Sequence, residues 1–539
     1  MRDRTDSRTP ERVDLLGVGL GPFNLGLAAL TEPLGAPSTA FVEADADFRW
    51  HPGMLIEGST IQLPFMADLV TLADPTSPYS FLAYLKACGR LYSFYIREDL
   101  NPLRAEYERY CRWVSDQLPT LHYGERVVAV ERDAEGFVVT SEREGGAPVE
   151  RLTRHLALGI GTEPSYPAAA AGITGTVVHS GHYLQRRDDL AALDHVTVVG
   201  SGQSAAEIYH DLLQRAEGTG RHVAWVTRSP RFFPMEYTKL TLEMTSPDYA
   251  RYHRELPEPV RAGLARSQRH LYKGISSELV DAIYDTLYRI EVEQGGVATT
   301  LATSSELRGG RDEDGRTVLD LHHLEQDRGY TLTTDAVVLS TGYTPRVPAM
   351  LDPVLGHLRR DERGRLVTDA AFRVDLAEPD APHGRVYMQN GDEHVHSLIA
   401  PDLGMGAWRN SVILADLLGE EIYPVERRIA FQDFGVPAGA GAPAPARPAR
   451  HTHAGAARRG AGPAAARAPG AGPFRGGPPG GGVARGRAAA PVGRGARAPA
   501  RPVVNAGTAG LGAPVVSTAE DGAAITVSLL AVFAPVLVV

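Results

Sequence analysis

Cysteine is nearly absent from this chain of 539 residues, in which Cys88 and Cys111 are the only two. They stand far apart in the sequence, and no C-x-x-C motif or other close pair exists. A redox-active dithiol needs two neighbouring cysteines, and a disulfide-stabilised secreted domain needs several. The sequence therefore excludes dithiol redox chemistry and predicts a cytoplasmic protein.

Long apolar runs are missing as well. The N-terminal segment MRDRTDSRTPERVD is charged throughout, whereas a secretory signal requires an apolar stretch. Near the C-terminus, Ala523–Val539 is apolar, but it is short and is interrupted by Thr526, Ser528 and Pro535. We therefore expect no signal peptide, no membrane-spanning helix and no membrane partner.

Residues 437–539 lack lysine and any regular apolar periodicity. The segment is rich in Ala, Gly, Pro and Arg, with eleven arginines against two acidic residues, Glu520 and Asp521. Because it has little apolar surface to bury, it is predicted to be disordered. Nucleic-acid binding is not expected, because Phe474 is the only aromatic residue before Phe533. A GC-rich gene read out of frame would give the same composition, which the mass of the intact protein tests.

The remaining residues contain two glycine-rich loops, and the first lies in VDLLGVGLGPFNLGLAAL. Gly17, Gly19 and Gly21 form its turn, and Pro22 replaces the third glycine of G-x-G-x-x-G. Such glycines let the backbone approach a pyrophosphate at the N-terminus of the next helix, where proline is tolerated. Glu43 ends the next apolar run, where an acidic residue is expected to bind ribose hydroxyls.

The second loop lies in HVTVVGSGQSAAEIYHDLL. It contains Gly200 and Gly202, with Ala205 as an accepted variant of the third glycine. The strand-like run that follows ends in Arg228 instead of an acidic residue. Arginine at that place suits a 2′-phosphate, so the sequence favours NADPH over NADH. Two such loops predict two nucleotides held close enough for electron transfer between them.

Strand-like and helix-like segments alternate between and after the loops, which predicts an α/β fold. Val127–Val130 and Phe137–Thr140 resemble a hairpin. Leu156–Gly161 runs into GTEPSYP and Ala336–Leu339 into STGYTP, and both suit hinges between two domains. The predicted boundaries are residues 12–190 and 335–435 for a discontinuous first domain, 191–334 for the second, and 247–295 for a helical substrate subdomain.

From Asp14 to about Gly435, the chain resembles the flavin-dependent N-hydroxylating monooxygenases of siderophore biosynthesis, which act on lysine, ornithine or diamines. Five motifs in the family's order carry the resemblance: GVGLGPFNLGLAAL, FRWHPGMLIEGSTIQLPFMADLVTLADPTSPYSFLAYL, VVGSGQSAAEIYHDLL, STGYTP and HSLIAPDLGMGAWRNSVIL. In addition, ITGTVVHSGHY nearly fits the F-x-G-x-x-x-H-x-x-x-[WYF] pattern of the wider flavin monooxygenase class, with Ile173 in place of phenylalanine.

The resemblance implies two Rossmann-like domains, with FAD at the first loop and NADPH at the second. NADPH reduces FAD, oxygen adds to give a C4a-hydroperoxide, and a neutral primary amine takes the distal oxygen. No residue is then expected to act as a catalytic acid or base, and no metal is required, because the protein positions the reactants and excludes water. A homo-oligomer, dimer or tetramer, is expected from the family.

The resemblance also assigns roles to individual residues. It implies that the residues of the two loops bind the cofactors, namely Gly17, Gly19, Gly21, Pro22, Glu43, Gly200, Gly202 and Arg228. The further cofactor contacts that it implies are Trp50, His51, Gln62, Gln203, Ser204, Thr341, Gly342, Tyr343, Asp402, Leu403 and Gly404. The implied substrate contacts are Gln62, Ala67, Leu242 and Leu403. A lone histidine more often packs than binds, and it is the FRWHPGM context of His51 that favours a flavin contact.

One position reduces the number of candidate substrates. Family members that act on lysine or ornithine usually have a lysine in a Q-x-x-F-L-K-D-L-like segment, where it pairs with the substrate carboxylate. Here the segment is QLPFMADL, with Ala67 at that position, and Leu242 aligns with a second carboxylate contact. A buried carboxylate without a cation would be costly, so we predict cadaverine first and putrescine second. The alternative is that Lys86 or Arg104 replaces the missing lysine.

Other functions remain open at this point. The nearest are L-lysine N6- or L-ornithine N5-hydroxylation. A flavin monooxygenase that oxidises a ketone or a sulfide is more distant, and so is a non-enzymatic redox sensor or scaffold whose basic tail recruits a partner. A flavin disulfide reductase is excluded by the missing cysteine pair.

Overall fold

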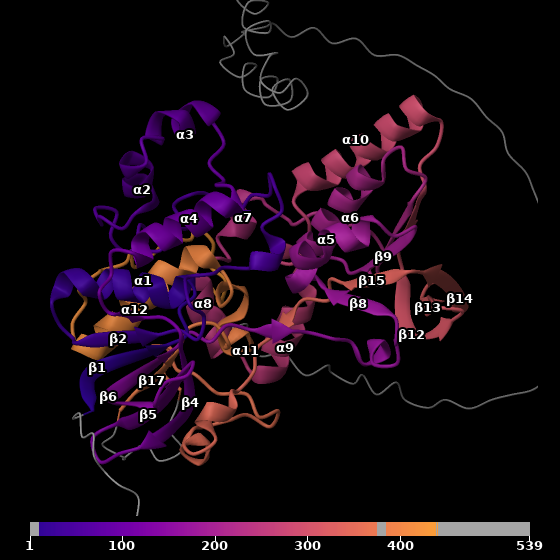
Figure 1. Cartoon of the computed structure of the whole chain (residues 1–539). Coiled ribbons are helices and arrows are strands. Elements are labelled where there is room, and N and C mark those ends of the chain that lie inside the picture. Colours follow the sequence, from indigo (N-terminus) through magenta and orange to yellow (C-terminus); the bar gives the residue numbers. More distant parts are fainter. Residues whose placement is uncertain (1–9, 375–383, 438, 440–539) are drawn as a thin grey trace, which may run out of the picture. The chain divides into compact units, whose positions relative to one another are not determined.

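The computed structural model describes residues 10–374, 384–437 and 439. The predicted disordered tail, apart from residues 437 and 439, and the apolar run Ala523–Val539 lie outside the described residues. Among the described residues, no helix combines the length and apolarity needed to cross a membrane. The described part contains two large sheets that are joined by two short connections, together with a three-stranded and a two-stranded sheet, and the predicted α/β fold is confirmed (Figure 1).

The first sheet has seven strands and begins with the first glycine loop's strand, β1. Its strands are β1 (Glu11–Val18), β2 (Thr39–Val42), β3 (Leu121–His122), β4 (Glu125–Arg132), β5 (Phe137–Arg143), β6 (Val149–Leu158) and β17 (Val386–Met388). Strand β1 pairs in parallel with β2 and β6, and β17 returns to pair in parallel with β6. Strands β4 and β5 are antiparallel, as the predicted hairpin requires.

Helices cover one face of this sheet. They are α1 (Pro22–Thr31), α4 (Arg104–Ser115) and α12 (Gly406–Leu418), and their apolar residues share one core with the sheet. The opposite face packs against segments between residues 347 and 374. Helices α2 (Phe81–Ala87) and α3 (Leu91–Arg97) stand away from the sheet beyond α4 (Figure 1).

The second sheet is parallel throughout and carries the second glycine loop. Its strands are β8 (Thr176–His179), β9 (His195–Val199), β10 (His222–Val226), β11 (Thr299–Ala302) and β15 (Ala336–Leu339), in the order β11-β10-β9-β15-β8. These strands are nearly continuous apolar runs because both faces are covered. Helices α5 (Tyr183–Ala191), α6 (Gln203–Ala216) and α10 (Ser277–Gln294) lie on one face. The antiparallel strands β12 (Ser305–Glu313), β13 (Arg316–His323) and β14 (Arg328–Thr334) lie on the other.

The two connections between the sheets lie side by side. The short strands β7 (Glu163–Pro164) and β16 (Tyr343–Thr344) belong to the two predicted hinges and pair antiparallel. Strand pairing places β8 and β15 in the second sheet, so the chain crosses between sheets after β6 and after β15. The predicted domain boundaries at 190 and 335 differ from these crossings, because β8 and β15 extend the sheet that β9 begins.

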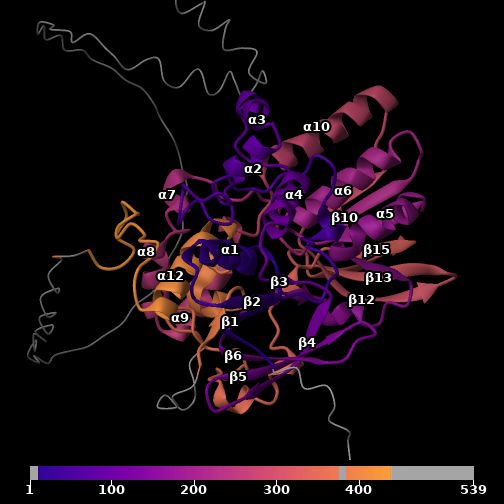
Figure 2. The same cartoon turned by 60° about the vertical axis from the view of Figure 1, so that its left-hand side comes forward.

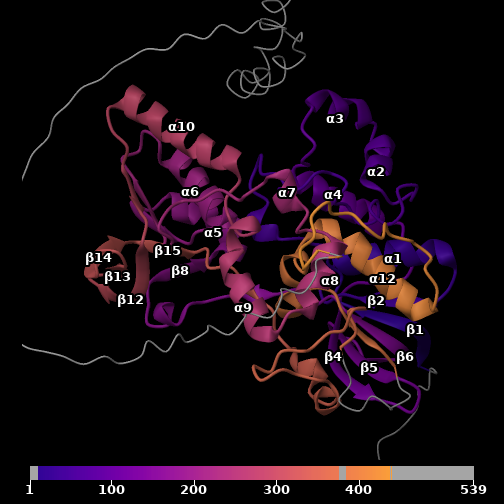
Figure 3. The ribbon, with the colours of Figure 1, turned by 180° about the vertical axis from the view of Figure 1, so that it is seen from behind.

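The segment predicted to be helical divides between the two sheets. Helices α7 (Lys239–Leu242), α8 (Pro247–Glu255) and α9 (Glu258–Ser267) precede α10 in the chain. Helix α8 packs through Tyr249 and Ala250 against Leu398 and Ile399, near α11 (Glu393–His396). Helix α10 instead packs on α6 over the second sheet, as Figures 2 and 3 show from two sides. The helices therefore do not form one separate subdomain.

Candidate functional site

The first glycine loop fits a backbone that approaches a neighbouring strand. Gly19 has φ +82°, and a β-carbon added there would lie 2.5 Å from the Gly159 carbonyl oxygen. A β-carbon on Gly17 would strike the Phe41 ring. Gly21 has nothing within 4 Å of the same position, so the loop is open on that side. Two glycines thus serve close packing, and the third leaves room for a ligand.

The N-terminus of α1 is equipped for an anion. No side chain caps Gly21, Pro22 occupies the first turn, and that turn has no acidic residue. Free backbone N–H groups and the helix dipole then face the open side of the loop. Glu43 accepts hydrogen bonds from the backbone N–H groups of Leu20 (2.7 Å) and Asp45 (3.0 Å). Its carboxylate therefore lies beside the loop at the end of β2.

The second loop repeats this arrangement at the start of α6. Gly202 is not capped by a side chain, and the first turn of α6 has no acidic residue. A β-carbon on Gly200 would lie 2.4 Å from the Ser340 carbonyl oxygen. The buried Ser340 hydroxyl has no partner among the described residues. Arg228, after β10, is exposed. Both loops therefore fit a dinucleotide.

A cavity of about 590 Å³ lies between the two loops. It brings together eleven of the predicted residues: Gly21, Pro22, Trp50, His51, Gln62, Gln203, Ser204, Leu242, Tyr343, Asp402 and Leu403. The other predicted residues do not line it: Gly17, Gly19, Glu43, Ala67, Gly200, Gly202, Arg228, Thr341, Gly342 and Gly404. Thr341 and Gly342 lie in the second hinge, and Ala67 is buried next to Gly404.

An aromatic wall surrounds His51. Its ring centroid lies 5.1 Å from that of Trp50 and 6.0 Å from that of Tyr343. His51 is exposed and lines the cavity, and desolvation by the surrounding protein, together with the charge of Arg104, lowers its pKa to about 4. His51 is therefore neutral at pH 7. Its backbone is left-handed, with φ +48°, a conformation that a non-glycine residue adopts at some cost.

Asp402 is the only acidic residue that lines this cavity. Burial raises its pKa to about 6, although backbone N–H groups of Gly404 and Met405 and the charge of the buried Arg409, which does not line the cavity, stabilise the carboxylate. Tyr237 also lines the cavity, and its pKa is raised to about 12 by burial and then by the charge of Asp402. The cavity thus contains a carboxylate whose pKa is raised by burial.

The two cations of the cavity already have partners. Arg49 donates to Asp47 at 2.8 Å, and both guanidinium nitrogens of Arg104 donate to the carboxylate of Glu207 on α6. Lys86, the other candidate to replace the missing lysine, is exposed on α2 and does not line the cavity. Neither candidate is therefore available to a substrate carboxylate in this structure.

The lining residues that sequence reasoning missed include Tyr237 and Asn390. Asn390 follows β17, and ligands of parallel sheets gather at the carboxyl ends of strands, so this rule could have identified it. Tyr237 lies in an irregular segment before α7 that carries no motif. Its position near Gln62, whose carbonyl oxygen accepts a hydrogen bond from the Tyr237 hydroxyl, depends on the fold.

Two glycine loops on separate sheets, one shared cavity and an aromatic wall define a flavoprotein with two dinucleotide-binding domains. Residues 11–345 match the family model of L-lysine 6-monooxygenase/L-ornithine 5-monooxygenase, and the chain belongs to this family. The enzyme is an FAD- and NADPH-dependent N-hydroxylating monooxygenase, as the sequence predicted. Residues 478–539 separately match a domain of unknown function, DUF4126.

Three relatives illustrate the likeness. The putrescine N-hydroxylase of Shewanella oneidensis is 46% identical over 424 residues, which cover 78% of this chain and 84% of that protein. The FAD-bound cadaverine monooxygenase of the desferrioxamine pathway from Erwinia amylovora is 44% identical, with a TM-score of 0.76, and covers 79% of this chain and 99% of that one. The ornithine N-hydroxylase of Kutzneria, with reduced FAD, NADP⁺ and L-ornithine, is 27% identical, with a TM-score of 0.70, over 76% of this chain and 99% of that one.

Proposed function

We propose that this enzyme N-hydroxylates an aliphatic diamine, cadaverine in preference to putrescine, in hydroxamate siderophore biosynthesis. The relatives named for putrescine and cadaverine are more similar in sequence than the ornithine enzyme. The observation that carries the proposal is the charge of the cavity, where Asp402 is a carboxylate without a cationic partner among the lining residues.

A diamine and an amino acid differ at the end of the molecule away from the amine that is hydroxylated, because only the amino acid carries a carboxylate there. The second ammonium of a diamine would pair with Asp402 and form a charge-assisted hydrogen bond. The α-ammonium of lysine or ornithine could pair with Asp402 as well, but the adjacent carboxylate would then lie near Asp402 without a free cation, because Arg49 and Arg104 are held by Asp47 and Glu207. Because a buried substrate carboxylate without a cationic partner would cost roughly several kcal/mol, the cavity favours the diamine.

The chain's own residues mainly bind and orient. Trp50, His51, Gln62 and Leu403 would hold the flavin at the cavity wall, and the neutral His51 adds no positive charge there. When bound and reduced by NADPH, FAD supplies the activation of oxygen. The side chains of Leu242, which is 39% exposed, and Leu403 add apolar surface beside the reacting amine, which must be neutral to react. Asp402 holds the distal ammonium and so fixes which nitrogen is presented.

NADPH would bind across the second loop. The N-terminus of α6 faces the cavity with Gln203 and Ser204, and its free N–H groups suit the pyrophosphate. Gln203 is held in place on both sides, since it accepts from the Ser276 backbone N–H (2.8 Å) and donates to Glu207 (2.9 Å). The exposed guanidinium of Arg228 suits the 2′-phosphate.

The proposal includes a homo-oligomer in the cytoplasm. Helix α3 exposes Tyr92, Tyr95 and Ile96, each more than 70% exposed, and α10 exposes Tyr284 and Tyr288. Both helices lie on the same side of the protein (Figure 2). Large exposed apolar residues that cluster favour contact with a second copy. Light scattering on the wild type and on a Tyr92→Ser/Ile96→Ser variant tests this, and an unchanged mass would exclude α3 from the contact.

The decisive experiment measures hydroxylamine product with cadaverine, putrescine, L-lysine and L-ornithine at equal concentrations. We expect efficient turnover of the diamines, with cadaverine ahead of putrescine, and poor coupling of NADPH oxidation to product with the amino acids. Oxygen uptake, measured in parallel, separates hydroxylation from release of hydrogen peroxide. Efficient lysine hydroxylation together with poor cadaverine turnover would contradict the proposal.

A further inference from the structure

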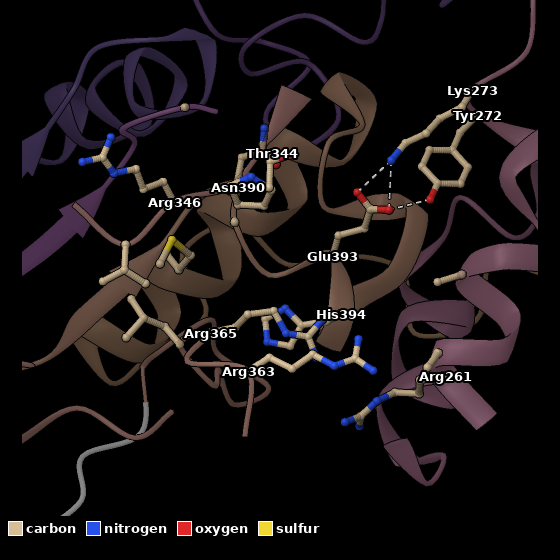
Figure 4. Close-up of a pocket in the computed structure, with 18 of the residues that line it drawn as sticks. Arg261, Tyr272, Lys273, Thr344, Arg346, Arg363, Arg365, Asn390, Glu393 and His394 are labelled. Carbon is tan, nitrogen blue, oxygen red and sulfur yellow. Dashed lines mark hydrogen bonds and ion pairs between the residues drawn. The ribbon is translucent and has the colours of Figure 1, made fainter. Parts of the chain in front are cut away.

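A second cavity, of about 670 Å³, adjoins the first and has no role in the proposed function. The two cavities share only Gly161, Tyr272 and Asn390 among their lining residues. The second cavity is bounded by α9 and by segments 344–347, 363–366 and 388–394, which follow the second hinge in the chain (Figure 4). It therefore lies where α9 meets the hinge and the end of β17.

The lining of this second cavity is strongly cationic. Seven lining residues are arginine or lysine and two are glutamate, in a chain with a net charge of −10. Arg261, Arg266 and Arg269 come from α9 and the turn after it. Arg363 and Arg365 face them from the opposite wall, as Figure 4 shows for Arg261, Arg363 and Arg365. A concave surface of one sign of charge attracts ligands of the other sign.

Several of these cations are free to bind. The guanidinium groups of Arg266, Arg269 and Arg363 make no hydrogen bond or ion pair with any residue that the structure describes, and all three are exposed. In contrast, Lys273 is held by Glu393, with both N–O distances 3.1 Å. The free arginines lie on both walls of the cavity, so one ligand can meet them together.

Two buried nitrogens on the cavity lining also lack partners. The Nε atom of Arg261 and the Nε2 atom of His394 are buried without a hydrogen-bond partner among the described residues. Burial and the charge of Arg365 lower the pKa of His394, so the imidazole is neutral at pH 7. Unpaired buried polar atoms are costly and are commonly satisfied by water or a ligand. The cavity thus offers unmade hydrogen bonds as well as positive charge.

The remaining lining is apolar. Ile160, Val347, Leu366 and Met388 lie together on the lining, away from α9 in the sequence. A cavity of this size, with an apolar part and charged groups opposite, suits a small organic molecule and not an isolated ion. A doubly cationic diamine would be repelled by the arginines, which excludes this cavity as a second substrate site.

We propose that the second cavity binds a small organic polyanion with at least two carboxylate or phosphate groups, contacted by Arg266 from the α9 side and by Arg363 from the opposite wall. A tricarboxylate and a phosphorylated nucleoside share this chemistry. The bound molecule would link α9 to segment 363–366 and so stabilise the fold at this junction.

The test uses the full chain loaded with FAD and saturated with NADP⁺, so that the coenzyme site is filled. Binding of citrate and of ADP is measured by calorimetry and by thermal shift at constant ionic strength, with inorganic phosphate as the simple anion. The Arg266→Ser/Arg363→Ser variant removes one free guanidinium from each wall. Arg126→Ser is the matched control, because Arg126 is an exposed arginine on β4 that lines neither cavity.

We expect citrate or ADP to bind the wild type and the control equally, and to bind the double variant at least about tenfold more weakly. Preference for citrate identifies a tricarboxylate site, and preference for ADP identifies a nucleotide site. Equal affinity in the double variant, displacement of the anion by NADP⁺, or no binding of either anion at about 1 mM would overturn the inference. Basal diamine turnover should be unchanged in the double variant.

Discussion

The methyl group of Ala67 lies against Gly404, where an added β-carbon would be 3.5 Å from the Ala67 β-carbon. Ala67 is only 6% exposed, so a longer side chain at this position would crowd Gly404, which follows Asp402 and Leu403 in the same turn. The small apolar residue at position 67 adds no cation to this turn, where the charge that lowers the pKa of Asp402 is that of the buried Arg409. This contact connects the unusual QLPFMADL segment with the proposed amine site.

The Ala67→Lys variant should bind cadaverine poorly. Its added ammonium would pair with Asp402 in place of the substrate, and we expect the KM for cadaverine to rise about tenfold or more. The matched control is Ala67→Met, which adds similar length without charge. Steady-state hydroxylamine formation is the measurement. Equal effects of lysine and methionine would show that size, not charge, matters at this position.

Asp402→Asn should raise the KM for cadaverine by about 10- to 100-fold, because a hydrogen bond to a charged group contributes about 1.5–3 kcal/mol. Because the proposal assigns Asp402 to the amine and not, as the resemblance implied, to the cofactor, FAD content and the KM for NADPH should stay near the wild-type values. The conservative Asp402→Glu variant should retain part of the affinity. An unchanged cadaverine KM in Asp402→Asn would remove Asp402 from the substrate site.

The same carboxylate predicts a pH dependence. With a pKa of about 6, Asp402 loses its negative charge as the pH falls through 6, so the wild-type KM for cadaverine should rise below that pH. The diamine's own ionisation affects wild type and variant alike and cancels in the ratio of their KM values. We expect the ratio of the Asp402→Asn KM to the wild-type KM to approach one at low pH. A ratio independent of pH would contradict this assignment.

The ion pair between Arg104 and Glu207 should contribute strongly to stability. The side chains are 12% and 6% exposed, and two N–O contacts of 2.7 Å join the start of α4 to α6. Arg104→Met leaves Glu207 buried and unpaired, which should lower the free energy of unfolding by about 3–5 kcal/mol. Arg109→Met, an exposed arginine on the same helix, should change it by about 0.5 kcal/mol or less.

Urea denaturation of the FAD-loaded enzyme measures both changes. Adding Glu207→Gln to Arg104→Met should recover part of the loss, because the remaining buried group is then neutral. If Arg104→Met unfolds like the Arg109→Met control, the pair does not stabilise the fold.

Gly19→Ala should abolish or greatly reduce FAD binding. Its β-carbon would collide with the Gly159 carbonyl at 2.5 Å, and φ there is +82°. Gly35→Ala separates the two effects, because Gly35 has φ +66° with nothing within 4 Å. We expect Gly35→Ala to lose only about 1–2 kcal/mol of stability and to keep its flavin, as flavin absorbance of the purified proteins will show. Equal flavin loss in both would indicate backbone strain alone.

Arg228→Gln should weaken NADPH binding selectively. Without the guanidinium, the 2′-phosphate loses its charged partner, so the KM for NADPH should rise about tenfold while that for NADH changes little. NADPH oxidation and NADH oxidation are compared in the same preparation. The exposed Arg126→Gln serves as the control. A parallel rise for both coenzymes would place Arg228 away from the 2′-phosphate.

Local signals predicted the elements that depend on local geometry. The strand Ala336–Leu339 has the predicted bounds, and the predicted hairpin is formed by β4 and β5. The helical segment 247–295 was recognised, but its division between two packing partners was not. Apolar periodicity shows which face of a helix is buried and does not show against what.

The sequence alone was sufficient to predict both glycine loops and to identify the family. It also showed that Ala67 occupies a position where lysine is usual in relatives that act on amino acids. These are local requirements, since close backbone approach and helix N-termini need particular residues at fixed spacing. Only the tertiary structure determined which partners the charged side chains have. In the folded protein, Asp402 lines the first cavity and its pKa is raised by burial. Arg104 forms an ion pair with Glu207, and Arg266 and Arg363 line the same second cavity. Charge pairing depends on distance in space, and only folding brings such distant segments together.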